Sequence, residues 1–251
     1  MDIAYRFGDP SKLYLNVTNR CTNRCGFCIR YHADGVGDGN LWGGPEPDLD
    51  ALLTAVEARR GSEPFHEITW CGFGEPTYRL DLVTAAAPHL RRASHSIRLN
   101  TNGHACLIHG RDVLPELAAA VDDVSVSLNA PNRRRYLELC RPDPASVAAA
   151  GTDAQEGHPG PEGLTGKADM EGSEGQASRA GQARIAADPR NLGIERTPRD
   201  FWGAMLDFFA RAPGRFRSVQ ASVVGAVLTP DEIEASRALA QSLGVELFRV
   251  R

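Results

Sequence analysis

The stretch Asn19-Arg20-Cys21-Thr22-Asn23-Arg24-Cys25-Gly26-Phe27-Cys28 places three cysteines within eight residues, at the spacing C-x3-C-x2-C. An apolar run, Leu13 to Val17, stands before it and predicts a strand. Thiolates are soft ligands, so three of them in one short loop favour a metal site. A zinc site or disulfide-forming cysteines are the alternatives, although no Cys or His pair stands at the spacing that closes a zinc tetrahedron.

An iron–sulfur centre with an open position is the form of metal site that this loop favours. Four-iron clusters have one corner per iron and are usually held by four cysteines, so a local triplet leaves one iron free to bind another molecule. An open position is also what separates catalytic zinc sites from structural ones. The loop follows the C-terminal end of the predicted strand, where loops carry chemistry in parallel α/β folds.

Composition is typical of one ordinary soluble domain. The 251 residues are 42% hydrophobic and 24% charged, with a net charge of -4 at pH 7. This charge gives no general reason to expect nucleic acid or a membrane as a partner. The first residues, Met1 to Arg6, do not resemble a signal peptide, and no run is long enough to cross a bilayer. We expect a cytoplasmic protein, since a reducing compartment suits both six unpaired cysteines and an oxygen-sensitive cluster.

A glycine-rich turn, Gly72-Phe73-Gly74-Glu75, follows the second predicted strand. Glycines let the backbone approach a ligand closely and leave main-chain N–H and C=O groups free to bind it. An isolated Gly-x-Gly-Glu turn is weak evidence, because strand-to-helix connections use the same residues. Its place on the strand after the cysteine loop makes it a stronger candidate for a binding site.

The segment from Val124 to Asn129 alternates apolar and polar residues. Period two places Ser125, Ser127 and Asn129 on one face of a strand. Strands of parallel barrels are normally apolar on both faces, so this polar face indicates a polar ligand, and a solvated edge strand is the alternative. The preceding predicted strand ends in Thr101-Asn102-Gly103, which is first of all a turn signal.

Six predicted strands alternate with helices and indicate an α/β fold with a parallel sheet and right-handed crossovers. Six units are too few to close an eightfold barrel. The strands are expected at 12–18, 67–71, 96–100, 124–129, 219–224 and 245–250. The helices are expected at 48–60, 80–91, 112–120, 132–139, 198–210 and 231–243.

A single domain interrupted by a disordered insertion is the predicted organisation. No Phe, Trp or Tyr occurs between Tyr136 and Phe201, and residues 151–190 contain eight glycines. Such a segment cannot bury enough apolar surface to offset its ordering entropy. We therefore place the insertion at about residues 143–197 of a domain that spans 1–251.

Several remaining polar residues have a structural and a functional interpretation. Arg133 to Arg135 form a solvated helix face or, alternatively, a clamp for phosphate or carboxylate. His104 and His109 are interpreted as surface residues of a polar loop. The three isolated cysteines are most simply small buried residues, with a redox partner or hydrogen donor among them as the alternative: Cys71, Cys106 and Cys140.

Five strings resemble the radical S-adenosylmethionine (SAM) superfamily: Leu15–Cys21, Cys28–Arg30, Cys71–Thr77, Arg98–Gly103 and Ser125–Pro131. Members of that superfamily carry the C-x3-C-x2-C signature with an aromatic residue at the position of Phe27. The likeness is greatest to the subgroup named for its association with TatD-type nucleases, and it covers nearly the whole chain except the insertion. It implies an open (β/α)6 partial TIM barrel, the radical SAM core, with the site at the C-terminal ends of the strands.

By this resemblance, Cys21, Cys25 and Cys28 would hold a [4Fe-4S] cluster, whose fourth iron is chelated by the amino and carboxylate groups of SAM. The glycine-rich turn is similar to the family's GGE motif, with Phe73 at the middle position, and its backbone would bind the methionine part. The full set of cofactor-binding residues that the resemblance implies is Phe27, Gly72, Phe73, Gly74, Glu75, Asn100, Asn102, Ser127, Asn129 and Gly225. It does not identify further catalytic residues.

The resemblance also implies a reaction and partners. Reductive cleavage of SAM would generate a 5′-deoxyadenosyl radical that abstracts hydrogen from an unknown substrate. An electron donor such as flavodoxin or ferredoxin would supply the electron, and a TatD-type nuclease is a candidate partner. The alternative from a different class is an iron–sulfur binding or sensor protein that acts with a nuclease partner and initiates no radical chemistry.

Overall fold

The computed structural model describes residues 1–61, 64–148 and 200–251. The predicted insertion at 143–197 therefore lies almost wholly outside the described residues. Its first residues are described: α6 (Ala145–Ala148) begins there, and the Tyr78 hydroxyl donates to the Ser146 carbonyl oxygen at 2.8 Å. Regular structure thus continues past the predicted boundary. Within the described residues, no helix is both long and apolar enough to cross a membrane.

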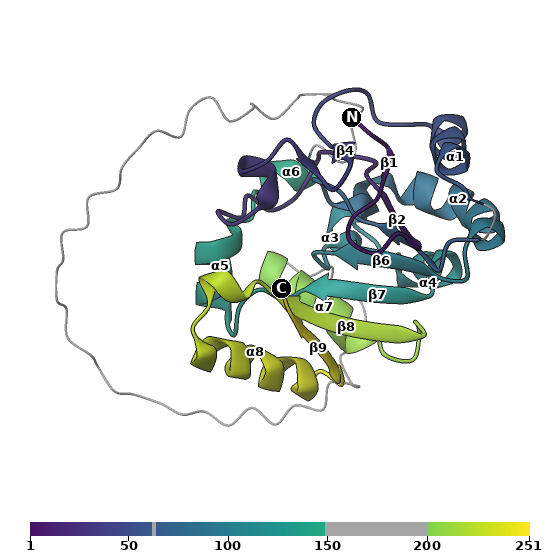
Figure 1. The fold of residues 1–251 in the computed structure, drawn as a ribbon. Coiled ribbons are helices and arrows are strands. Elements are labelled where there is room, and N and C mark those ends of the chain that lie inside the picture. Colours follow the sequence, from purple (N-terminus) through teal and green to yellow (C-terminus); the bar gives the residue numbers. More distant parts are fainter. Residues whose placement is uncertain (62–63, 149–199) are drawn as a thin grey trace, which may run out of the picture.

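A seven-stranded sheet forms the centre of the molecule, in the order β1-β2-β5-β6-β7-β8-β9 (Figure 1). The last six strands are parallel and lie in sequence order, whereas β1 pairs antiparallel with β2. This confirms the predicted open (β/α)6 arrangement of an α/β fold. The strands are β1 (Ala4–Tyr5), β2 (Lys12–Leu15), β5 (Glu67–Trp70), β6 (Ile97–Thr101), β7 (Asp123–Ser127), β8 (Ser218–Val223) and β9 (Leu247–Val250).

Helices connect consecutive parallel strands and cover the outer face of the sheet. In Figure 1, α1 and α2 lie at the upper right and α8 runs along the lower edge. The helices are α1 (Leu49–Ala58), α2 (Leu80–Ala93), α3 (Ala105–His109), α4 (Leu114–Ala120), α5 (Arg133–Cys140), α7 (Phe201–Arg211) and α8 (Pro230–Ser242). Helix α1 begins after Asp48, whose side chain accepts a hydrogen bond from the Ala51 N–H at 2.8 Å, as an N-cap residue does.

Short elements account for most differences from the sequence prediction. The hairpin β3 (Gly35–Val36) and β4 (Gly39–Asn40), like β1, is too short for hydrophobic periodicity to reveal. Strand β2 ends at Leu15, and the chain leaves the ladder three residues before the predicted end at 18. Helix α3 lies in a segment that we expected to be a polar loop.

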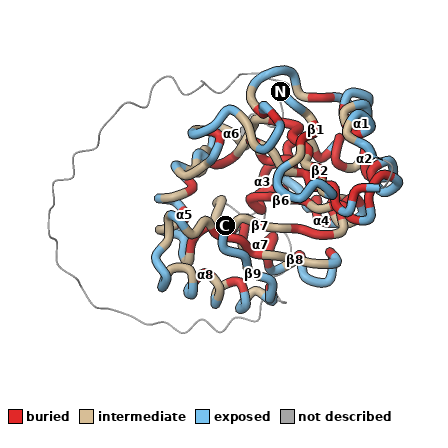
Figure 2. The backbone as a smooth tube through the Cα atoms, in the orientation of Figure 1, coloured by how far each residue is buried: buried red, intermediate tan, exposed pale blue. Residues whose placement is uncertain are grey.

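Alternate residues of the parallel strands form the core between sheet and helices. Figure 2 shows buried segments gathered where strands and helices meet. The side chains on this outer face are almost fully buried: Leu13, Leu15, Ile68, Trp70, Leu99, Val124 and Val126. Burying each such side chain contributes about 1.5–3 kcal/mol, so this face drives folding.

The other face of the sheet, here called the inner face, is polar. It carries Lys12, Tyr14, Glu67, Thr69, Arg98, Asn100, Asp123, Ser125, Ser127, Ser218, Gln220 and Ser222. Strand register places Asn100 beside Ser125, and Ser127 beside Ser222. Because β7 lies between β6 and β8, the solvated edge-strand interpretation of residues 124–129 is wrong. The serines of β7 face the inside of the partial barrel.

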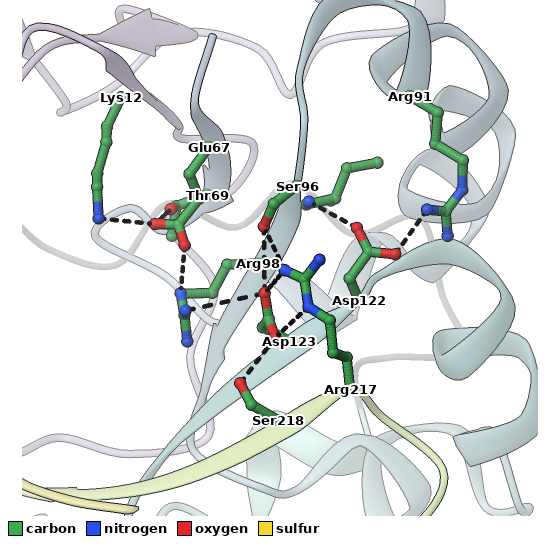
Figure 3. Close-up of polar contacts among 11 residues, drawn as sticks. Lys12, Glu67, Thr69, Arg91, Ser96, Arg98, Asp122, Asp123, Arg217 and Ser218 are labelled. Atoms are coloured by element: carbon green, nitrogen blue, oxygen red, sulfur yellow. Dashed lines mark hydrogen bonds and ion pairs between the residues drawn. The ribbon is translucent and has the colours of Figure 1, made fainter.

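At the amino-terminal edge of the sheet, ion pairs fill the inner face (Figure 3). Glu67 lies between Lys12, at 3.4 Å, and the Arg98 guanidinium, which donates at 2.8 Å. Asp123 is almost fully buried and accepts hydrogen bonds from Ser96, Ser218 and Arg217. Although burial opposes it, hydrogen bonding to Arg217 and Ser218 holds the pKa of Asp123 below its usual range. These contacts join the beginnings of five neighbouring strands.

Replacing Asp123 with Asn should lower the free energy of unfolding at pH 7 by about 3 kcal/mol, because it removes the charge that Arg98 and Arg217 share. Urea denaturation measures this. Glu57→Gln is the control, since Glu57 is exposed and its one ion pair among the described residues is with Arg60, just beyond the end of α1; it should change stability by about 0.5 kcal/mol or less. Equal stabilities of the two variants would contradict a structural role for this network.

Candidate functional site

The cysteine loop lies at the carboxyl edge of the sheet, defined as the edge where the six parallel strands end. It follows β2 and leads into a short 3-10 helix, Ile29–Tyr31. All six cysteines of the chain are free thiols, so the disulfide interpretation finds no support in the structure. The loop is attached to α5 by backbone hydrogen bonds, from Arg24 N–H to the Cys140 carbonyl at 2.9 Å and from Gly26 N–H to the Leu139 carbonyl at 3.3 Å.

Cys21, Cys25 and Cys28 are half-buried neighbours. Burial raises the pKa of Cys21 to about 12, and Cys25 adds to this effect. Burial also raises the pKa of Cys28, again with a contribution from Cys25. In the described ranges, no three His, Cys, Asp or Glu side chains converge on a single metal ion. A zinc ion needs its sulfur ligands at about 2.3 Å from one point, whereas an iron–sulfur core of several atoms is larger and takes more widely spaced sulfurs.

Arg30 is a buried cation next to these thiols. It is 3% exposed and forms no ion pair with any described carboxylate; its Nη1 donates to the Asn19 and Phe73 carbonyls at 3.2 and 3.3 Å. Its Nε has no hydrogen-bond partner there. The guanidinium opposes the rise in pKa at all three cysteines. A buried charge without a counter-ion costs several kcal/mol, so this one fits a site that carries negative charge when it is filled.

The glycine-rich turn after β5 packs directly against the cysteine loop. A Cβ at Gly72 would lie 2.0 Å from Asn16 Oδ1, and one at Gly74 would lie 2.4 Å from the Thr18 carbonyl oxygen. The Phe73 N–H donates to Asn16 Oδ1 at 3.1 Å. The glycines are thus needed for close backbone approach, as predicted, but the partner that the structure shows is the cysteine loop.

Glu75 is buried and fully engaged inside the protein. Its carboxylate accepts from the Thr77 N–H and hydroxyl, from the Thr101 hydroxyl at 2.7 Å and from the Asn102 N–H at 2.7 Å. Its own N–H donates to the Arg20 carbonyl at 2.8 Å. Burial raises the pKa of Glu75 despite these bonds. Four donors occupy the carboxylate, which leaves the main chain of this turn as the part available to a cofactor.

Asn102 touches the cysteine loop, and Asn100 does not. The Asn102 side-chain nitrogen lies 2.7 Å from Thr22 Oγ1 and 3.8 Å from the Cys21 sulfur. Asn100 lies on the inner face, beside Ser125 of β7. Both are at the carboxyl edge, as strand β6 and its turn predict.

Asn129 combines backbone strain with an unpaired polar atom. Its φ of 57° is left-handed, and its side chain is buried. The side-chain oxygen has no hydrogen-bond partner in the described structure. Strain of this kind costs about 1–3 kcal/mol, and an unsatisfied buried acceptor costs a similar amount. Such a residue fits a position that is completed by a bound molecule.

The remaining candidates pack against protein. Phe27 is half-buried against the main core, and Phe73 belongs to a small cluster with Tyr5 and Leu41. Beside Gly225 the space is filled, since a Cβ there would lie 2.7 Å from Val250 Cγ1.

His104 is fully buried, so its interpretation as a surface residue is wrong. Its Nδ1 lies 2.7 Å from Thr22 Oγ1, and its Nε2 lies 3.0 Å from the Tyr136 hydroxyl. Asn23, in the cysteine loop, donates to the same hydroxyl at 3.1 Å. The residue is buried because α3 turns back behind β6 and packs against α7, with Phe201 edge-on to the imidazole. In the sequence, the signal that His104 belongs to the site was its position directly after a predicted parallel strand.

The other predicted alternatives are resolved by neighbouring charges and burial. Arg133, Arg134 and Arg135 each pair with a carboxylate, which supports a solvated face over an anion clamp. His109 is half-buried, with Nε2 2.8 Å from the Thr77 carbonyl. Cys106 and Cys140 are buried, and the nearby Cys140 thiol raises the pKa of Cys25.

Protonation of His104 should destabilise the fold. Burial lowers its pKa to about 3, against about 6.5 in an unfolded chain. The stability of the neutral form is therefore present above about pH 6.5 and is lost as the pH falls below that value. Between pH 7.5 and 5.5, the wild type should lose about 1.4 kcal/mol more than His104→Gln in urea denaturation.

His89→Gln is the matched control, because His89 is exposed on α2. It should follow the wild-type pH dependence. Identical pH dependence of the wild type and His104→Gln would show that His104 titrates normally in the folded protein.

Comparison with known protein families matches residues 15–153 to the radical SAM superfamily. The match covers more than half of the chain, which therefore belongs to this superfamily; its members are enzymes that bind a [4Fe-4S] cluster and SAM. No curated protein matches the sequence.

Two solved structures show the same fold. A structure of TYW1 with a lysine–pyruvate adduct bound has a TM-score of 0.50 and 10% identity, covering 98% of this chain and 66% of that one. A crystal structure of methylornithine synthase (PylB) has a TM-score of 0.50 and 10% identity, covering 96% of this chain and 52% of that one. The chain thus spans just under two thirds and about half of these neighbours, and at this identity the likeness concerns the fold alone.

Proposed function

We propose that Cys21, Cys25 and Cys28 hold a [4Fe-4S] cluster and that SAM binds at its open iron. The observation that carries this proposal is the buried Arg30 guanidinium, which has no described counter-ion and favours the thiolate form of all three cysteines. Three thiolates on a cluster supply the missing negative charge. When bound, the cluster and SAM supply an electron and a 5′-deoxyadenosyl radical for hydrogen abstraction from a substrate that is not known.

The chain's own residues hold and orient these groups. The main chain of residues 72–75 and the free oxygen of Asn129 stand at the carboxyl edge as positions for SAM. Asn102 donates toward Cys21, an interaction that stabilises a sulfur ligand. Trp42, edge-on to Phe73, covers the turn and helps to keep water from it. Asn100, Phe27 and Gly225 remain cofactor candidates by family resemblance, whereas the side chain of Ser127, for which the resemblance implies the same role, is engaged by Arg251.

Partners form a further part of the proposal. Superfamily chemistry requires an electron, and flavodoxin or ferredoxin are suitable donors. The resemblance of the five motif strings to the TatD-associated subgroup supports a TatD-type nuclease as a partner.

Reconstitution tests the proposed activity. After anaerobic treatment with iron and sulfide, the wild type should convert SAM to 5′-deoxyadenosine when dithionite is added, as measured by chromatography. Cys28→Ala should bind less iron and form no product above background, because it lacks one of three ligands. Cys106→Ala, a change in α3 outside the proposed cluster ligands, should retain both properties. A fully loaded wild-type cluster that gives no 5′-deoxyadenosine would overturn the radical enzyme assignment.

The sensor alternative has one observation in its favour. Cys140 lies beside Cys25, and a fourth thiolate at the cluster would leave no open iron for SAM. Cys140 is fully buried on α5, and its own carbonyl and that of Leu139 accept hydrogen bonds from the cysteine loop, which favours a supporting role instead.

Cys140→Ala separates these two functions. If the cluster has an open iron, SAM should change the electron paramagnetic resonance spectrum of the reduced cluster in both wild type and Cys140→Ala. If Cys140 is the fourth ligand, SAM should leave the wild-type spectrum unchanged, and the variant should lose or alter its cluster. A thermal melt of each protein distinguishes loss of a ligand from loss of the fold.

A further inference from the structure

Two arginines extend the polar inner face at its last strand. Register places Arg249 of β9 beside Ser222 of β8, and Ser222 beside Ser127 of β7. Arg251 is two residues further along, on the same face and nearer the carboxyl edge. Its Nη2 donates to Ser127 Oγ at 3.1 Å. A cation from the last strand is thereby fixed above the middle of the sheet.

Neither arginine forms an ion pair with any described residue, unlike the arginines at the amino-terminal edge. The groups that act on Arg251 are a thiol at the end of β5, a thiol of the cysteine loop and the other arginine: Cys71, Cys28 and Arg249. Two like charges side by side repel each other, so the bare arrangement is unfavourable. An anion between them would remove this repulsion.

Strand register places both arginines on the inner face, which is the inside of the partial barrel. Strand β9 is four places from β5 and five from β2 in the strand order. Arg249 nevertheless acts on the pKa of Tyr14 in β2, and Arg251 acts on that of Cys71. The Arg251 side chain is open to water, yet surrounding protein disfavours its charge and lowers its pKa. Arg251 is thus a water-accessible cation on the concave side of the sheet. Nearby protein disfavours its charge, which does not happen to an arginine surrounded by water alone.

We propose that Arg249 and Arg251, with Ser127, bind a carboxylate or phosphate group of the substrate at the carboxyl edge. A planar guanidinium pairs with either oxyanion through two parallel hydrogen bonds. Ser127 accepts from Arg251, and no described residue accepts its hydroxyl proton, which therefore remains for the anion. The site would hold an anionic small molecule near the cysteine loop. The inference rests on the proposed function, in which the SAM carboxylate is already taken up by the cluster.

Binding of two simple probes tests the site. Inorganic phosphate and malonate would be titrated into the full-length protein by isothermal calorimetry, with and without reconstituted cluster and SAM. The wild type should bind at least one probe at a single site. Arg251→Gln and Arg249→Gln should each weaken that binding about tenfold or more, because each removes a charged, two-pronged contact. Arg134→Gln, an exposed change on α5, should leave it unaltered.

The affinity for SAM separates the substrate from the cofactor. If the arginines serve the substrate, Arg251→Gln should keep the wild-type affinity for SAM. An equal loss of SAM binding would assign them to the cofactor and overturn the inference. Equal probe binding by all four proteins, or binding by none, would also overturn it. The probes are also titrated into protein without cluster. Failure of the anion site can therefore be distinguished from failure of the protein to cleave SAM.

Discussion

The buried carboxylate of Glu75 is the contact on which the arrangement of the carboxyl edge depends. It accepts hydrogen bonds from the turns after β5 and β6, while its N–H donates to the cysteine loop. Three loops that follow three different strands are thus fixed by one residue. The glycines at 72 and 74 add to this, because their lack of a side chain lets two backbones touch. Movement of any one loop would leave a buried acceptor or donor unsatisfied.

The two edges of the sheet differ in how their polar groups are paired. At the amino-terminal edge, Glu67 and Asp123 form ion pairs with the neighbouring cations, so the charges at this end are neutralised within the protein. At the carboxyl edge, Arg30, Asn129 and Arg251 keep unpaired charge or hydrogen-bonding capacity among the described residues. Stability is therefore concentrated at one end, and unsatisfied groups that a ligand would complete are concentrated at the other.

The sequence was sufficient to predict the six parallel strands, because period two and β-α alternation depend on local pattern, whereas their arrangement as an open (β/α)6 barrel was implied by the family resemblance. It also placed the loops of Cys21 and Gly72 at one edge, since the ends of parallel strands share it. His104 was mistaken for a surface residue because its burial depends on α3 folding back onto α7, a tertiary contact that no local pattern encodes. Arg30 and Arg251 were missed for the same reason: an unpaired cation is recognised only when its neighbours in space are known.

The neutral imidazole of His104 has a consequence for the direction of its hydrogen bonds. An uncharged ring offers one donor and one acceptor, so the protons of Thr22 and Tyr136 are not independent of each other. If Nδ1 carries the ring proton, Nδ1–H donates to the Thr22 hydroxyl and the Tyr136 hydroxyl donates to Nε2. If Nε2 carries it, both hydroxyls reverse their roles. The two hydrogen bonds of the imidazole therefore have two opposite directions, while the Asn102 side-chain N–H donates to Thr22 in both, and the choice of tautomer sets the local dipole behind the cysteine loop.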